Sequence, residues 1–286
     1  MSQPVVRASR RADWPAVRRL YALARRAFVH FGDEDLPAYV ASEGPLYGWL
    51  AEEKGRVSAF AACAARRAAW PELRGLLLAD AWPDESLLLA LFGRLEADLG
   101  GLGAEGIMCL VADEWLPALL ERAGFRLEEH VVALRWQGAT LPEASSDDPL
   151  LRLRPARGDD VSALVALDDA AFDPMWRLGR HVMSLYLVTT THFVVAEQEG
   201  TLVGYVVADA RGSEAQVIRL AVHPARQGRG IGRRLLVDAL AYARGAGAET
   251  VVLNTQASNA ASLHLYRHLG FRDVGRAVPV WVRRLR

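Results

Sequence analysis

Apolar and polar residues in the second half of the chain follow two different periods. Short apolar runs bounded by turn residues predict strands. These runs lie at residues 151–154, 193–196, 202–208, 215–222, 250–254 and 278–283. Apolar positions with a period near 3.6 predict helices that begin at the N-caps Asp159 and Asn259, near residue 175 and near residue 230. The resulting order, β-α-α-β-β-β-α-β-α-β, predicts a mixed α/β sheet.

The first half of the chain repeats this pattern. The matching positions are Asp13 and Asp160, Gly55 and Gly200, Pro83 and Pro224, and Gly124 and Gly270. Their separations are 147, 145, 141 and 146 residues in that order. The drop at the prolines and the recovery after them indicate that the first half lacks about five residues following Pro83. The repeat therefore predicts two copies of one fold, of which the first has lost a loop.

A polar segment separates the two copies. Residues 137–149 are rich in Pro, Ser, Asp and Gly, which is typical of a linker. We expect a first domain at residues 1–137, a linker at 138–149 and a second domain at 150–286.

The loop missing from the first copy is rich in glycine in the second. An apolar strand ending at Val222 is followed by Gly228, Gly230 and Gly232, and then directly by a helix. Glycines let successive backbone N–H groups converge on one point, and a helix N-terminus adds free N–H groups and a partial positive charge. This arrangement suits a pyrophosphate, and Arg229 and Arg233 add positive charge.

Composition narrows the possible partners. Lys and Arg together number 34, as do Asp and Glu, so nothing favours a nucleic acid or an anionic membrane as partner. Cys63 and Cys109 lie in apolar stretches, which argues against disulfides and a cysteine metal site. No apolar run approaches the ~18 residues that a membrane span requires, and the N-terminus lacks the apolar region of a secretory signal. We expect a cytoplasmic protein without a metal.

The glycine loop resembles the coenzyme A-binding signature of the GNAT acetyltransferases, Gln/Arg-x-x-Gly-x-Gly/Ala. Gln227, Gly230 and Gly232 fill its positions, and the Asn-to-Gly-Phe block at residues 259–271 resembles the family's later motif. A dinucleotide-binding loop is rejected, because it needs Gly-x-Gly-x-x-Gly and an acidic residue after the next strand, which here ends in Asn254. The resemblance implies two GNAT-like domains in tandem, with acetyl-coenzyme A as the co-substrate of the second.

The resemblance also implies roles for individual residues. A bulge in the strand before the loop would free backbone N–H groups that bind the pantetheine arm and polarise the thioester carbonyl. Tyr266 is the candidate general acid for the departing thiolate, and the alternative for it is a core tyrosine. Asn259, seven residues earlier on the same helix face, would hold the pantetheine. The expected coenzyme contacts are Leu220, Ala221, Val222, Gln227, Gly228, Arg229, Gly230, Ile231, Gly232, Arg233 and Asn259.

The sequence offers several candidates for the general base. The two positions where relatives carry Glu hold Gln216 and Asn254 here, and neither amide accepts a proton usefully. The remaining candidates are His223, Glu214 and the acidic group Asp168, Asp169 and Asp173. We expect the acidic group to attract a cationic amine. Arg219 is an alternative acceptor contact, which would pair with a carboxylate.

The first copy lacks the residues that carry these roles. Asp84 and Glu85 stand where the glycine loop should be and would repel a pyrophosphate, while Leu120 replaces Tyr266 and Asp113 replaces Asn259. We therefore expect residues 1–137 to be non-catalytic.

The function expected of the second copy is acetyl transfer from acetyl-coenzyme A directly to an amine of a small molecule or a peptide N-terminus. Two alternatives stay open. One is a non-catalytic acyl-coenzyme A sensor, and the other is a protein N-terminal acetyltransferase, which residues 256–260 resemble locally. The oligomeric state is open.

Overall fold

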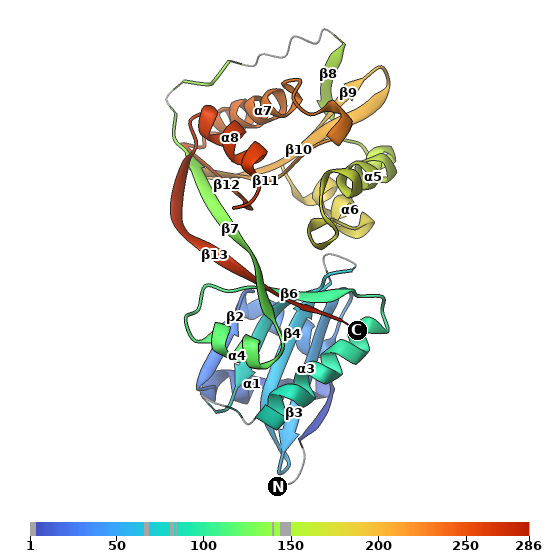
Figure 1. Ribbon diagram of the computed structural model, residues 1–286, viewed down its shortest axis with the longest axis vertical. Coiled ribbons are helices and arrows are strands. Elements are labelled where there is room, and N and C mark those ends of the chain that lie inside the picture. The colour runs from blue at the N-terminus through green and yellow to red at the C-terminus, as the bar shows by residue number, and fades with distance from the viewer. Residues whose placement is uncertain are drawn as a thin grey trace. The chain divides into compact units, whose positions relative to one another are not determined.

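A computed structural model describes residues 4–65, 69–80, 83, 85–138, 140–143 and 150–285. The chain divides into two compact units (Figure 1). Unit 1 comprises Met1–Glu128 and Pro279–Arg286, and unit 2 comprises Glu129–Val278. In the described part of the chain, no helix has the length and apolar character needed to cross a bilayer.

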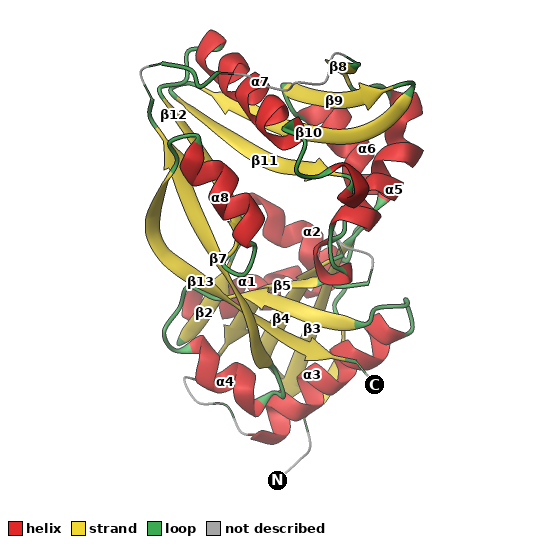
Figure 2. Cartoon of the chain, turned by 45° about the horizontal axis from the view of Figure 1, so that its top comes forward, coloured by secondary structure: helices red, strands yellow, loops and turns green. Residues whose placement is uncertain are grey.

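Unit 2 is a mixed sheet with helices packed on it (Figure 2). Its strands, in spatial order, are β7 (Arg126–Trp136), β12 (Thr250–Gln256), β11 (Glu214–Val222), β10 (Thr201–Arg211), β9 (His192–Gln198) and β8 (Leu151–Pro155). Its helices are α5 (Val161–Ala171), α6 (Arg180–Thr189), α7 (Ile231–Gly245) and α8 (Ala260–His268). The β11–β12 pair is parallel and the others are antiparallel.

The alternation of side chains along the strands divides the core of unit 2 into two layers. Val194 and Val206 belong to a buried cluster with residues of α7 and α8. Their neighbours Val195 and Val207 belong to a separate cluster with residues of α5 and α6. Successive strand residues point to opposite faces, so the sheet is covered on both sides. The predicted order of elements in this half is confirmed, but two boundaries differ. The helix expected from about residue 175 begins at Arg180, after a 3-10 turn at Pro174–Trp176, and β13 (Arg272–Arg284) starts earlier than expected.

Unit 1 has the same kind of sheet. Its strands are β1 (Val5–Ala8), β2 (Arg26–Val29), β3 (Leu46–Glu53), β4 (Arg56–Ala64), β5 (Glu72–Leu78) and β6 (Gly106–Leu110). Its helices are α1 (Trp14–Leu23), α2 (Leu36–Ala41), α3 (Glu85–Gly100) and α4 (Leu116–Arg122). Leu120, the counterpart of Tyr266, is fully buried.

The repeat extends to individual contacts. Arg7 forms two hydrogen bonds of 2.7 Å to Asp13 and one of 2.9 Å to Glu52. Arg154 forms the same contacts with Asp160, at 2.8 and 3.0 Å, and with Glu197 at 2.8 Å. The hydrogen bond from each arginine lowers the pKa of its Asp partner.

The expected N-cap Asp159 was wrong. Asp160, not Asp159, accepts the backbone N–H of Arg157 at 2.8 Å, because its carboxylate is already held in place by Arg154. A short 3-10 turn, Gly158–Asp160, then leads into α5.

The shortened loop of the first copy is visible from where the helices begin. α3 begins two residues after Pro83, whereas α7 begins seven residues after Pro224. This difference matches the five missing residues. Asp84 lies outside the described residues, as does part of the predicted linker, residues 139 and 144–149.

Two strands do not pair where their order in the chain suggests. β7 follows α4 of unit 1, but its residues 131–136 pair antiparallel with β12 of unit 2. β13 follows α8 of unit 2, but its residues 280–284 pair antiparallel with β6 of unit 1. These strands are drawn green and red in Figure 1. Each unit is therefore completed by a strand from the other half of the sequence.

Candidate active site

Strands β11 and β12 separate halfway along their length. Their parallel pairing ends at Val217 and Leu253. A β-bulge in β11 accompanies the separation, because Val207 and Ala208 of β10 face Arg219 and Val217 and leave Ile218 between them. The bulge is therefore present on the expected strand, two residues before Leu220. Beyond it, one side of β11 lacks β12 as a partner.

Backbone N–H groups point into this separation. The N–H of His223 donates to the carbonyl of Val203 on β10 at 2.9 Å. Successive N–H groups of a strand alternate in direction, so those of Leu220 and Val222 point away from β10 and that of Ala221 points toward it. The carbonyl of Val222 accepts the side-chain amide of Gln227 at 3.1 Å. This bond ties the glycine loop to the end of β11.

The glycine loop adopts conformations that require glycine at two positions. Gly228 has φ +74° and Gly230 has φ +77°, in the left-handed region that side chains with a Cβ disfavour. Gly230 is the N-cap of α7, so the free N–H groups of the first turn face the end of the loop. At Gly232 a Cβ would lie 3.4 Å from Leu265 and 3.6 Å from Val222, so its absence lets a ligand approach the backbone.

A pocket of about 600 Å³ lies between these elements. The predicted coenzyme contacts all line it except Arg229, which is exposed. The pocket has further lining residues that were not predicted from the sequence: Ala171, Phe172, Arg226, Ala261, Ser262, His264 and Leu265. Arg226 precedes the loop directly and was recognisable as a further cation, whereas Phe172 lies far away in sequence and had no such signal.

Tyr266 does not line this pocket, although Ser262 and Leu265 of the same helix do. It is 6% exposed and belongs to the core cluster, and it forms a side-chain hydrogen bond with Ser262, which lines the pocket. Burial raises the pKa of Tyr266, so its hydroxyl stays protonated at neutral pH. Asn259 is the N-cap of α8, as predicted, and accepts the N–H of Ser262 at 3.0 Å.

A second pocket, of about 400 Å³, shares Ala171, Phe172 and Asn259 with the first. Its other lining residues are Glu129, Asp169, Ala170, Asp173, Trp176, Arg177, Gln256 and Ser258. Asp169 and Asp173 of the acidic group are thus exposed beside the first pocket. Glu129 was not predicted from the sequence, because no local pattern in β7 indicates that this strand pairs with β12.

Asp168, the third member of the acidic group, does not face either pocket. It is 0% exposed and accepts hydrogen bonds from Arg219 at 2.7 Å, from the N–H of Leu178 at 2.8 Å and from the hydroxyl of Tyr205. Arg219 also stacks on Phe172, 3.5 Å from the ring centre. The expectation that Asp168 attracts an amine was wrong, because its charge is neutralised internally. Arg219 does pair with a carboxylate, but with this buried one.

Comparisons with known proteins identify the family of this chain. The model of the acetyltransferase (GNAT) family matches residues 163–271. An IAA acetyltransferase from Azospirillum brasilense is 34% identical over 124 residues, which make up 38% of this chain and 81% of that protein. The chain belongs to the GNAT acetyltransferase family.

Two further relatives are matched over a smaller share of their own length. The N-alpha-acetyltransferase RimI of Mycobacterium tuberculosis is 47% identical over 88 residues, 29% of this chain and 54% of that protein. A mycothiol acetyltransferase from Propionibacterium freudenreichii is 35% identical over 155 residues, 49% of this chain and 48% of that protein. The chain thus spans about half the length of each of these two relatives.

The whole chain matches a solved structure of a tandem GNAT protein from the clavulanic acid biosynthesis pathway. The match covers 99% of both chains with a TM-score of 0.60 and 14% sequence identity. Identity this low shows the fold alone. It confirms the prediction of two GNAT-like folds in one chain.

At the two positions where GNAT relatives carry a Glu that can act as general base, this chain has amide side chains. Gln216 and Asn254 are both exposed. Glu214 opens β11, at the opposite end of the strand from the glycine loop. His223 uses its Nδ1 to accept the N–H of Ala225 at 3.3 Å. Neither of these last two candidates lines the GNAT pocket.

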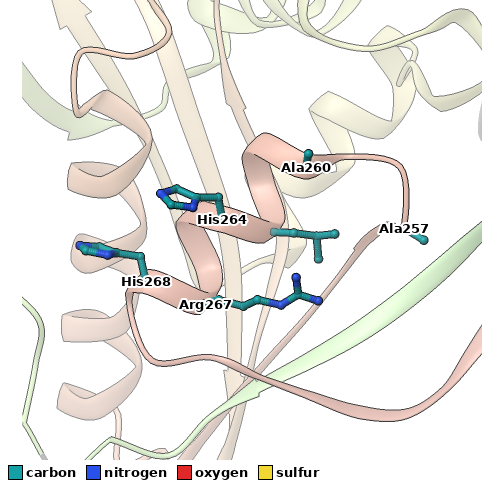
Figure 3. A pocket seen from close by; sticks show the side chains of 6 residues that line it. Ala257, Ala260, His264, Arg267 and His268 are labelled. Atoms are coloured by element: carbon teal, nitrogen blue, oxygen red, sulfur yellow. The ribbon is translucent and has the colours of Figure 1, made fainter.

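A third, shallow pocket lies on α8. His264 and His268 extend side by side from the helix while Arg267 points away from them (Figure 3). Among the described residues, no group of three or more His, Cys, Asp and Glu side chains is placed to hold a metal ion. His264 and His268 therefore have no third side chain beside them, among the described residues, with which to form a metal site.

Proposed function

We propose that unit 2 transfers an acetyl group from acetyl-coenzyme A to an amine. The observation that carries this proposal is the 600 Å³ pocket, in which the separated end of β11, the glycine loop and the N-terminus of α8 meet. A pocket of this composition offers free N–H groups at both places where the substrate carries or develops negative charge, the pyrophosphate and the thioester carbonyl.

The N-terminus of α7 holds the pyrophosphate, with Arg226 and Arg233 at its side. The pantetheine arm runs along the free side of β11 past Asn259. When the amine attacks the thioester, the N–H groups that point into the separation stabilise the oxyanion. Tyr266 then supplies a proton to the departing thiolate. Positioning and oxyanion stabilisation provide most of the rate, since no covalent enzyme intermediate is needed.

In this proposal residues 150–286 form the catalytic domain and residues 1–137 are non-catalytic. The short connection from Pro83 to α3 supports it, because it leaves no room for a glycine loop. β7 nevertheless belongs physically to the catalytic unit, since it pairs with β12.

Acetylation of a protein N-terminus is a second candidate for the same pocket. The identity to RimI favours it, since 47% over 88 residues exceeds the identity to the mycothiol and IAA acetyltransferases. A panel of acceptors that includes short peptides, amino acids, polyamines and amino sugars separates these classes.

Replacing Tyr266 by Phe tests the proposal. We expect kcat to fall about 100-fold in an assay of free thiol release, because a general acid contributes roughly 10²–10⁴-fold. Acetyl-coenzyme A affinity should stay within about twofold, since the hydroxyl is not needed for binding. Tyr242→Phe is the matched control, because Tyr242 stacks on His192 away from the pocket and should keep wild-type kcat.

Three outcomes contradict the proposal at different levels. Absence of acetyl-coenzyme A binding removes the function altogether. Tight binding without turnover of any acceptor favours the non-catalytic sensor. Turnover that survives unchanged in Tyr266→Phe removes only the role of Tyr266.

A further inference from the structure

The second pocket adjoins the pocket proposed for acetyl-coenzyme A. Ala171, Phe172 and Asn259 line both pockets, so a molecule in the second pocket touches the same wall as the pantetheine arm in the first. The charged residues of the second pocket are Glu129, Asp169, Asp173 and Arg177. Three carboxylates against one guanidinium favour a cationic acceptor.

Glu129 differs from the other carboxylates of this pocket because it is held in place. One of its oxygens accepts the N–H of His130 at 2.7 Å, and the other accepts the hydroxyl of Ser258. The backbone is fixed too, since the carbonyl of His130 accepts the N–H of Ala257 at 2.8 Å. An ionised carboxylate has about four acceptor positions, so each oxygen keeps one for a ligand.

Glu129 is also better placed to act as general base than the other candidates in the site. The usual positions of the base carry amides, and Asp168 is neutralised by Arg219. Asp169 and Asp173 are exposed, whereas Glu129 is partly buried on the wall that also carries Ser258 and Asn259. A base that is fixed and partly shielded from water meets the geometric requirement for proton transfer better than an exposed side chain.

We propose that Glu129 is the general base and that the acceptor enters this pocket as a protonated primary amine. This inference rests on the proposed acetyl transfer. The ammonium binds Glu129 and gives it one proton, and the neutral nitrogen then bonds to the thioester carbonyl carbon. The carbon–sulfur bond breaks, Tyr266 protonates the thiolate, and the second proton lost by nitrogen restores the tyrosine. Glu129 releases its proton to solvent.

Glu129→Gln tests this role, because glutamine keeps the shape and can still accept from Ser258. We expect kcat to fall at least 100-fold, while the melting temperature and acetyl-coenzyme A affinity match the wild type. The pH profile of kcat should also change in the variant, which has no carboxylate at this position to take the proton. Glu128→Gln is the matched control, since Glu128 is exposed and pairs with Arg284 at 2.6 Å.

Acceptors of low amine pKa separate catalysis from a structural role. An amine that is already neutral needs no base, so the deficit of Glu129→Gln should shrink as the acceptor pKa falls. A deficit that is the same for all amines, or a variant with wild-type kcat and pH profile, overturns the assignment of Glu129 while acetyl transfer stands. A wild type that binds acetyl-coenzyme A and acetylates no amine overturns both.

Discussion

Asp168 illustrates at the scale of one residue how burial decides the use of an acidic side chain. Its carboxylate neutralises Arg219, which is itself mostly buried. In Asp168→Asn the guanidinium keeps its charge but loses its counterion, and breaking one side of a buried pair costs about 3–5 kcal/mol. We therefore expect the free energy of unfolding to drop by this amount, measured by urea denaturation.

Asp169→Asn is the control for that measurement. Asp169 is the next residue of α5 but is exposed, so its free energy of unfolding should change by no more than about 0.5 kcal/mol. Equal stability of the two variants would show that the Asp168–Arg219 pair contributes nothing to the fold.

The residues of the site were predictable to the extent that their roles are local in sequence. Gly228, Gly230 and Gly232 act through backbone geometry over five positions, so the motif alone places them on the pocket. Asp168 and Arg219 are 51 residues apart, and only the folded chain shows that they neutralise each other. Because Asp168, Asp169 and Asp173 are close in sequence, all three were expected to attract an amine, which was wrong for Asp168.

At the scale of elements, the start of α7 is where the strand, loop and helix act together. Gly232→Ala adds a methyl group at ordinary contact distance, 3.4 Å from Leu265, and alanine favours a helix by about 1 kcal/mol over glycine. The fold should thus be as stable as the wild type or more so. The same methyl obstructs the ligand at the backbone, and we expect acetyl-coenzyme A to bind roughly tenfold more weakly by calorimetry, about 1.4 kcal/mol.

The last residue of α7 offers the matched substitution. Gly245→Ala also adds a methyl group to this helix, but nothing lies within 4 Å of it and it does not line the pocket. Its affinity for acetyl-coenzyme A should equal that of the wild type. An unchanged affinity in both variants would contradict the placement of the pyrophosphate at the start of α7.

Element positions followed from periodicity, but strand partners did not. The apolar runs predicted β9 to β12 because the apolar character of a run is a property of the segment itself. Pairing is a property of two segments. β7 follows α4 of unit 1 in sequence but pairs with β12, and this pairing buries Leu134 and Trp136 in the core of unit 2. Glu129 escaped notice for the same reason.

At the scale of the whole molecule, the internal repeat predicted two folds and the structure adds that each half supplies a strand to the other. A division of the chain between residues 137 and 150 leaves β7 with the first half of the sequence. The same division cuts through unit 2, because β7 from Glu129 onward belongs to that unit. Unit 2 as a physical body begins at Glu129, within β7. The catalytic proposal depends on β7 in two ways. The strand pairs with β12 beside the coenzyme pocket, and it carries Glu129, the proposed general base.

Two fragments, one with β7 and the following segment and one without them, test this dependence. Residues 126–278 contain all of unit 2, whereas residues 150–278 lack the strand that pairs with β12 from Val251 to Gln256. The shorter fragment also loses Leu134 and Trp136, which are 0% and 3% exposed. Burying each such side chain contributes about 1.5–3 kcal/mol or more, so the loss approaches the 5–15 kcal/mol that holds a typical domain together.

We therefore expect residues 126–278 to unfold cooperatively and to bind acetyl-coenzyme A, and residues 150–278 to do neither, as judged by circular dichroism and calorimetry. Trp136→Ala in the full chain isolates the packing contribution without removing the strand, and should cost about 3–5 kcal/mol. If the shorter fragment folds and binds as well as the longer one, β7 is dispensable to the coenzyme site. The strand would then contribute only to the acceptor pocket, which Glu129 lines.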